Sequence, residues 1–321
     1  MHISEVWDGE GFGPALARGA LFPFSLLYGL GWEAYLGMYK LGLKRAKHPH
    51  SPILCVGNLV SGGSGKTPVA LYLARLLPTL GFEVVVSCSG YGSPRSEAAT
   101  VAPEGELDAA QWGDEAALFR SLNPNLPLIV GRRRVLAAKL CHQSFPNAVL
   151  LMDDGFQHLP LKKDLTILLD SPLQHNKFCL PAGPYREPRW NRKRADMVIP
   201  GRFYVSDSIR LVDTQGASAE KPKECAVLCA IGQPQKLIVM LDLMNIDIVH
   251  ESLLPDHDPL TRGTLLRDVP DVPIVTTAKD WVKLRQRADI GERQFLILSH
   301  QVQIEPEAEF STWLKFHLDA I

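Results

Sequence analysis

The sequence predicts an α/β protein in which a parallel sheet is flanked by helices. Short apolar runs alternate along the chain with segments that repeat apolar residues at helical spacing, an order typical of parallel sheets. A glycine-rich stretch ending in Gly65-Lys66-Thr67 lies between the first such run and the first such helix. Two acidic residues, Asp153 and Asp154, follow a later apolar run. These features together favour a phosphate site at the strand ends.

The composition is that of a folded globular protein. Of the 321 residues, 46% are hydrophobic and 21% are charged, and this length favours two domains over one. The net charge of −1 provides no overall field that would attract nucleic acid. The six cysteines are scattered, and the closest pair, Cys225 and Cys229, has no His or Cys partner nearby. We expect buried thiols in a reducing compartment rather than a zinc site.

The N-terminal segment, residues 1–48, is expected to associate with a membrane surface. Residues 19–32 carry no charge, but a spanning helix needs roughly 20 apolar residues. Acidic residues precede this stretch where a signal peptide would be basic. Aromatic residues and a basic cluster, Lys40 to Lys47, follow it, as in helices that lie in the membrane interface. The alternative is a helix packed on the protein's own core.

The first domain, expected over residues 49–205, follows the order of strands and helices. Apolar runs that predict strands lie at 53–60, 82–92, 127–131, 148–154 and 165–170, and helical periodicity covers 68–81, 114–122 and 132–144. The polar stretch 206–225 predicts a linker. Residues 226–321 then repeat the strand and helix order as a smaller domain. The expected fold class is therefore a P-loop NTPase-like parallel sheet with flanking helices, a smaller C-terminal α/β domain and an N-terminal membrane-interface helix.

Residues 57–68, GNLVSGGSGKTP, are predicted to bind the phosphates of a nucleotide. The stretch follows a strand and precedes a helix, which is the context of a phosphate-binding loop. Glycines let backbone amides turn towards phosphate, and the helix N-terminus adds positive charge. Val60 stands where the usual pattern has its first glycine. The alternative is a chance glycine-rich turn. The predicted phosphate contacts are Gly62, Gly63, Ser64, Gly65, Lys66 and Thr67.

A magnesium ion is expected beside this loop. The Thr67 hydroxyl is suited to ligate Mg²⁺, and the Walker-type site needs an acid at the end of another strand. Asp153 and Asp154 meet that need, although an Asp-Gly pair also favours a plain turn. GTP-binding proteins recognise guanine with an Asn-Lys-x-Asp motif. The nearest match in this sequence, Leu161-Lys162-Lys163-Asp164, lacks the asparagine, which favours ATP over GTP.

At this point the sequence resembles a known family, the tetraacyldisaccharide 4′-kinases of lipid A synthesis. Their phosphate loop also lacks the first glycine. Further blocks resemble the family in the same order along most of the chain: SGYG at 89–92, GDEA at 113–116, DDGFQH at 153–158, LPAGPYREP at 180–188, PDH at 255–257 and TAKDWVKL at 277–284.

The resemblance implies an ATP- and Mg²⁺-dependent kinase. Its acceptor would be the 4′-hydroxyl of a tetraacylated glucosamine disaccharide 1-phosphate. The resemblance also implies a peripheral enzyme on the cytoplasmic face of the inner membrane, with a cleft between its two domains. We expect no nucleic acid and no obligate protein partner.

Roles carried over from the family are assigned residue by residue. Asp114 matches the catalytic acid residue, which could accept the hydroxyl proton, and His257 matches its partner. Because we place these two in different domains, we expect them to meet only on closure. Arg186 could neutralise phosphoryl charge or hold the substrate's 1-phosphate. Weaker candidates for the nucleotide or metal shell are Gln157 and Glu115.

Each role has a plainer alternative. Asp114 could be a helix N-cap, His257 a solvated turn residue, and Arg186 a surface ion-pair partner. Ser89 stands where the family usually has arginine, so a positive group is missing or comes from elsewhere. Two other functions stay open on the residues alone: a soluble kinase for a small sugar or nucleoside, and a nucleotide-switched membrane adaptor.

Overall fold

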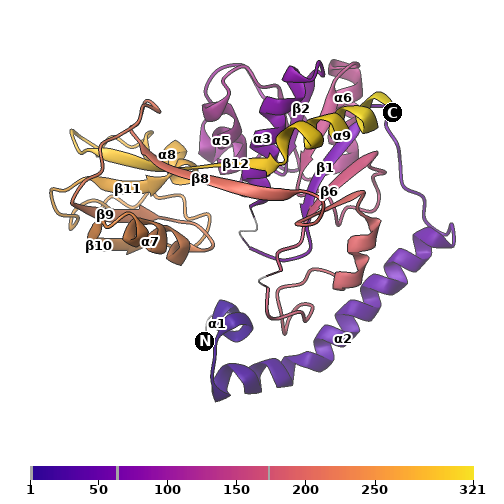
Figure 1. Cartoon of the computed structure of the whole chain (residues 1–321), viewed down its shortest axis with the longest axis horizontal. Helices are drawn as coiled ribbons and strands as arrows, with labels where there is room; N and C mark the ends of the chain where they lie inside the picture. Colours follow the sequence, from indigo (N-terminus) through magenta and orange to yellow (C-terminus); the bar gives the residue numbers. More distant parts are fainter. Residues whose placement is uncertain (1–2, 63–64, 173) are drawn as a thin grey trace. The chain divides into compact units, whose positions relative to one another are not determined.

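The computed structural model describes residues 3–62, 65–172 and 174–321 (Figure 1). Internal contacts divide the chain into two compact units. Unit 1 takes the described parts of Met1–Ser87, Arg134–Val205 and Ile304–Ile321, and unit 2 takes Cys88–Arg133 and Ser206–Gln303. Both units are therefore built from segments that are discontinuous in sequence.

Unit 1 contains the parallel sheet predicted from the first half of the chain. Five of the seven strands of this sheet belong to unit 1 and run in the order β2-β5-β1-β6-β7, and the pairings among these five are parallel. The residues of β1, β2, β5 and β6 are all buried, as expected when both faces of a parallel sheet are covered. The bounds are β1 Ile53–Asn58, β2 Val84–Cys88, β5 Val149–Asp153, β6 Leu165–Leu169 and β7 Met197–Ile199.

Helices α3 and α6 of unit 1 lie at the expected places, shifted by a few residues, whereas η1 and α9 were not predicted. Helix α3 begins at the end of the glycine-rich loop, and α9 comes from the C-terminus of the chain. The short η1 helix precedes β7. Their bounds are α3 Lys66–Thr79, α6 Arg134–Ser144, η1 Arg189–Arg194 and α9 Glu307–Asp319.

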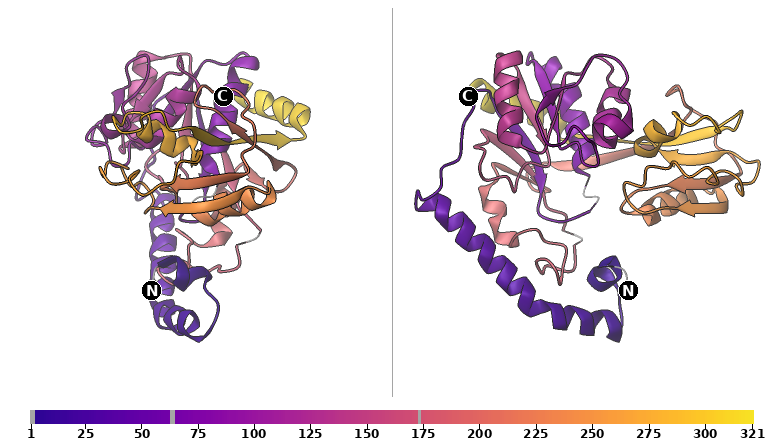
Figure 2. Two further views of the ribbon diagram at one scale, coloured as in Figure 1. Left: turned by 90° about the vertical axis from the view of Figure 1, so that its left-hand side faces the viewer. Right: turned by 180° about the vertical axis from the view of Figure 1, so that it is seen from behind.

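The N-terminal segment forms α1 (Ile3–Asp8) and the long α2 (Phe12–Lys40), which Figures 1 and 2 show apart from the sheet of unit 1. Helix α2 contacts the segment around η1: Ser25 Oγ donates to the Cys179 carbonyl at 2.7 Å, and Trp190 Nε1 donates to Glu33 at 3.0 Å. No helix in the described ranges is long and apolar enough to cross a membrane.

Unit 2 is built around a second sheet, in the order β10-β9-β11-β12-β8. Alternate residues of β9 point to opposite faces: Cys225, Val227 and Cys229 pack on α7, and Ala226 and Leu228 pack in the core that includes Leu284 of α8. The bounds are β8 Tyr204–Val212, β9 Glu224–Cys229, β10 Asp247–Leu253, β11 Ile274–Thr277, β12 Phe295–Glu305, α7 Pro234–Leu243 and α8 Ala278–Leu284.

Unit 2 also contains a segment from the first half of the chain, Cys88–Arg133. It forms the antiparallel pair of β3 (Thr100–Val101) and β4 (Leu128–Val130) and the helices α4 (Ala109–Trp112) and α5 (Asp114–Leu122). Helix α5 packs against α8. Residues 88–133 thus group with the second half of the chain, outside the expected 49–205 domain, and β8 occupies part of the expected 206–225 linker.

Candidate active site

The glycine-rich loop connects β1 to α3, and Lys66 is the first residue of that helix. Gly62 and Gly65 have φ angles of 98° and 77°, which only glycine adopts at little cost. Val60 is not among the residues with positive φ, so its side chain causes no backbone strain there. The predicted contacts Gly63 and Ser64 lie outside the described residues. Gly62 and Gly65 therefore have the left-handed backbone that a tight glycine-rich turn uses.

The Thr67 hydroxyl and the Asp153 carboxylate lie together at the carboxyl edge of the sheet. Asp153 ends β5 beside Val56 of β1, and Thr67 Oγ1 donates to Asp153 Oδ2 at 3.0 Å. The Asp153 side chain is buried. A hydroxyl and a carboxylate oxygen are ligands that Mg²⁺ prefers. The donor set therefore fits a magnesium ion.

Asp154 has different partners from Asp153. Its carboxylate accepts two hydrogen bonds from Arg186, at 3.0 and 2.8 Å, and lies 3.7 Å from Lys66 Nζ. Burial on its own raises the pKa of Asp154, but the charges of Lys66 and Arg186 outweigh it and lower the pKa. Asp154 is therefore ionised and orients two cations. Arg186 forms a two-pronged ion pair with Asp154 at the edge of the sheet, and its part in phosphoryl transfer stays a prediction.

Asn58 joins these groups, and the sequence analysis gave it no role. Its fully buried side-chain oxygen accepts from Lys66 Nζ at 3.0 Å and from the Arg186 guanidinium. The Gln157 side-chain amide donates to the Asn58 carbonyl at 2.8 Å and to the Glu187 carboxylate at 3.0 Å. The one feature of the sequence that could have indicated a role for Asn58 is its position as the last residue of the strand before the phosphate loop.

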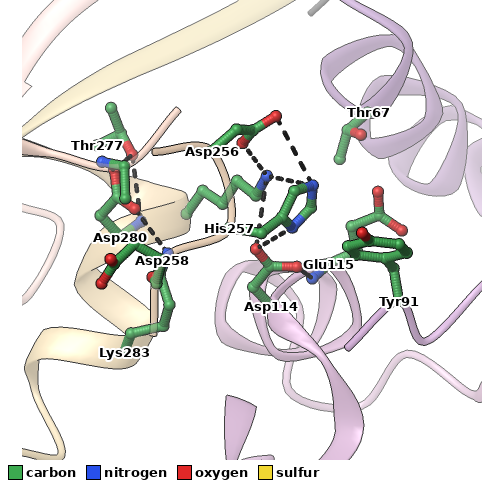
Figure 3. Close-up of polar contacts among 12 residues, drawn as sticks. Thr67, Tyr91, Asp114, Glu115, Asp256, His257, Asp258, Thr277, Asp280 and Lys283 are labelled. Atoms are coloured by element: carbon green, nitrogen blue, oxygen red, sulfur yellow. Dashed lines mark hydrogen bonds and ion pairs between the residues drawn. The ribbon is translucent and has the colours of Figure 1, made fainter. Parts of the chain in front are cut away.

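A second cluster lies in unit 2 (Figure 3). His257 Nδ1 lies 2.9 Å from Asp114 Oδ2, and the Tyr91 ring lies against the imidazole, with centroids 5.0 Å apart. The N-cap of α5 is Gly113, and Asp114 Oδ1 accepts from the Glu115 amide at 2.9 Å. The Glu115 carboxylate accepts from Ser89 Oγ at 3.3 Å, and its role as a metal ligand stays a prediction.

The expected meeting of Asp114 and His257 only on domain closure is wrong. Both residues belong to unit 2, where they are already in contact. The physical reason is that α5, which begins at Asp114, packs against α8 from the second half of the chain. The two residues therefore form a preassembled pair.

Asp114 and His257 each shift the pKa of the other. Burial on its own raises the pKa of Asp114, but the hydrogen bond to His257 and the charge of Lys279 outweigh it and lower the pKa to about 2. The hydrogen bond to Asp114 raises the pKa of His257 above its ordinary 6.5, against the effect of burial. Lys279 Nζ lies 3.4 Å from Asp114 Oδ2. Asp114 is thus an ionised acceptor in a largely desolvated setting.

Comparisons with known proteins agree on one family. The family model described as Tetraacyldisaccharide-1-P 4'-kinase matches residues 17–319. The Tetraacyldisaccharide 4'-kinase of Verminephrobacter eiseniae is 37% identical over 306 residues, covering 88% of this chain and 69% of that protein. The enzyme of the same name from Aromatoleum aromaticum is 32% identical over 309 residues, covering 89% and 90%.

A solved structure is similar across the same length. The crystal structure of LpxK from Aquifex aeolicus in complex with ATP superposes with a TM-score of 0.79 at 26% identity, covering 94% of this chain and 99% of that one. The mixed α/β fold predicted from the sequence is confirmed.

The Asp114–His257 pair should stabilise unit 2 within a limited pH window. The lowered pKa of Asp114 gives stability that is present above 3.8 and lost as pH falls towards about 2. The raised pKa of His257 gives stability that is complete below 6.5 and lost as pH rises through the raised value. Denaturant unfolding of wild type and Asp114→Asn should therefore differ most between these limits, by about 2 kcal/mol, and less at about pH 9. An equal difference at every pH would contradict this linkage.

Proposed function

The chain belongs to the tetraacyldisaccharide-1-P 4'-kinase family, and on that premise we propose how its residues perform the family's reaction. It is an ATP-dependent kinase of lipid A biosynthesis. The acceptor is the 4′-hydroxyl of a tetraacylated disaccharide 1-phosphate. The observation that carries this function is the family match across residues 17–319. The two polar clusters supply the groups that phosphoryl transfer needs.

Unit 1 binds the nucleotide. ATP supplies the phosphoryl group, and a bound Mg²⁺ would neutralise phosphate charge. The glycine-rich loop would bind the phosphates, Lys66 would contact the terminal ones, and Thr67 with Asp153 would hold the metal. Asn58 and Asp154 keep Lys66 and Arg186 in place, because both cations already contact both of these acceptors. Arg186 stabilises negative charge on the transferred group. Gln157 supports the loop from behind.

Asp114 acts on the acceptor hydroxyl. Its pKa of about 2 keeps the carboxylate ionised, so it orients the hydroxyl as an acceptor throughout binding. The proton passes to Asp114 as the phosphoryl group is transferred, when the hydroxyl becomes strongly acidic. His257 fixes the carboxylate through its Nδ1. A nucleotide-switched adaptor would have no need of such a pair.

The N-terminal segment places the enzyme on the membrane that holds its lipid substrate. On α2 the exposed side chains Leu16, Phe24, Leu27 and Leu30 recur at helical spacing. The buried residues Ser25, Gly29 and Leu36 form another face, which packs on unit 1. Exposed apolar residues and lysines continue beyond the helix. This arrangement supports peripheral binding at the cytoplasmic face of the inner membrane, and a soluble small-sugar kinase has no use for it.

The function is tested with radiolabelled ATP and a panel of acceptors. Wild-type protein should phosphorylate a tetraacylated disaccharide 1-phosphate and leave glucosamine and nucleosides unchanged. Lys66→Ala and Asp114→Asn should each lower kcat about a hundredfold or more, since each removes charge from the reacting groups. Lys315→Ala, on exposed α9, is the control. Activity on small sugars alone, or a folded Lys66→Ala protein with normal turnover, would overturn the assignment.

The two aspartates at the sheet edge should respond differently to magnesium. Asp153→Asn removes a charge from the proposed metal site, so half-maximal activity should require about tenfold more Mg²⁺. Asp154→Asn should lower kcat with little change in the Mg²⁺ requirement, because Asp154 orients Arg186 and Lys66. Titrating Mg²⁺ at saturating ATP compares the pair. Equal Mg²⁺ requirements in both variants would show that this division of roles is wrong.

Membrane binding by the exposed face of α2 is tested by introducing negative charges on it. Leu27→Glu and Leu30→Glu should leave the fold intact, since these side chains are 66% and 65% exposed. Each should weaken partition into anionic vesicles at least about tenfold, because burying one leucine is worth about 1.5 kcal/mol or more. Leu243→Glu, which is 77% exposed on α7 of unit 2, is the matched control. Sedimentation with vesicles measures the effect, and unchanged binding of both α2 variants would exclude this face.

A further inference from the structure

Helix α8 carries charged side chains in the network around Asp114 and His257, and neither the family resemblance nor the geometry of the pair assigned them a role (Figure 3). Lys279 Nζ lies 3.4 Å from Asp114 Oδ2, 3.3 Å from His257 Nε2 and 3.2 Å from Asp256 Oδ1. It is therefore the cation that contacts both members of the pair. Two further charged residues of the helix, Asp280 and Lys283, are buried.

The contact between Lys279 and His257 selects one form of the imidazole. A lysine ammonium has donors and no acceptor, so in the neutral imidazole, above the raised pKa of His257, Nε2 accepts from Lys279 through its lone pair. The remaining proton of the neutral ring then lies on Nδ1, which donates to Asp114. Lys279 thus makes the tautomer of His257 the one that orients the carboxylate.

Asp280 and Lys283 hold the backbone on both sides of His257. Asp280 Oδ2 accepts from the Ala230 amide at 3.0 Å, and the Ala230 carbonyl accepts from the His257 amide at 3.3 Å. Lys283 Nζ lies 2.9 Å from Asp280 Oδ1 and donates to the Asp258 carbonyl at 3.0 Å. One buried ion pair is therefore connected to His257 itself and to the residue after it.

The loop needs such support. His257 has a φ angle of 63° and Leu260 one of 57°, a left-handed conformation that costs free energy for residues other than glycine. It persists only when the surrounding structure holds it. A buried ion pair contributes little net stability, because desolvation offsets the attraction. Support of the His257 loop accounts for the Asp280–Lys283 pair better than stability does.

We propose that α8 is the positioning element of the Asp114–His257 pair: Lys279 sets the hydrogen bond between the two side chains, and Asp280 with Lys283 fixes the His257 backbone. The catalytic consequence rests on the function proposed above. Lys279, Asp280 and Lys283 act through His257 and Asp114, and are positioning residues in this reaction. The geometric part of the proposal concerns unit 2 alone and does not depend on the reaction.

A mutant cycle tests the catalytic part. Lys279→Met and Lys283→Met should each lower kcat at least about tenfold and leave the KM for ATP within about twofold. In a His257→Ala background Lys283→Met should cost less than about twofold, because the group it positions is gone, and Lys279→Met should cost less than in wild type, the remainder acting through its contact with Asp114. Lys315→Met on α9 is the control and should match wild type in both backgrounds. Equal losses with and without His257 would overturn the proposal, since they would indicate general damage to the fold.

Imidazole NMR of the full-length protein tests the geometric part without substrate. In ¹⁵N-histidine-labelled protein at alkaline pH, the His257 signals should show Nδ1 protonated and Nε2 bare. Lys279→Met should move the spectrum towards a mixture of tautomers, and Lys283→Met should speed exchange of the Nδ1 proton with water. The Lys279 side chain is 22% exposed and that of Lys283 is 7% exposed, so Lys279→Met disturbs the core less. If Lys283→Met fails to fold, the Lys279→Met spectrum decides the test. Unchanged His257 signals in the folded variants would overturn the proposal.

The two tests separate failure of the proposal from failure of the proposed function. If His257→Ala keeps full kinase activity while the NMR signals respond as expected, α8 positions a pair that the reaction does not use. In that case the positioning role stands and the assignment of the catalytic pair is wrong. If His257→Ala loses activity and the α8 variants do not, the catalytic pair stands and α8 has no part in it.

Discussion

The parallel direction of β1 and β5 is the constraint on which the nucleotide site depends. Parallel strands end at the same edge of a sheet, so the loop after β1 and the acids after β5 must meet there. Val56 lies opposite Asp153 in the register, which brings Thr67 to hydrogen-bonding distance of that carboxylate. A shift of one residue would turn Asp153 to the other face. The burial of both strands on both faces keeps the register in place.

Charge balance then decides what each polar group at this edge does. Lys66 and Arg186 would repel each other if they had no shared anion. Asp154 and the Asn58 oxygen both lie between them, so the cations are held ready for phosphate. Asp153 instead contacts Thr67. The two adjacent aspartates therefore have different partners, because one ends the strand and the other adopts a φ of 56°, and the proposed division between metal ligand and orienting residue rests on this difference.

In unit 2 a buried charge is likewise balanced by the groups that contact it. Asp114 is ionised although nearly all of it is withdrawn from water, and that is favourable only because His257 and Lys279 contact it. The helix that supplies Lys279 also supplies Asp280 and Lys283. Residues of α8 therefore contact Asp114, His257 and the loop that carries His257. Packing of α5 against α8 is thus both a structural contact and the reason that the pair exists.

The sequence by itself determined the features that depend on neighbours along the chain. Strand, glycine-rich turn and helix follow one another within residues 53–79, and their spacing alone predicts a phosphate loop at a parallel sheet. The resemblance blocks identified Asp114 and His257 as partners. Tertiary structure alone decided that these residues, 143 positions apart, share one unit. It also decided that Asn58 contacts Lys66 and Arg186 in unit 1, and that Lys279 contacts Asp114 and His257 in unit 2. The physical reason is that a loop motif is stabilised by local backbone geometry, whereas the placement of residues 88–133 depends on which distant apolar faces pack together.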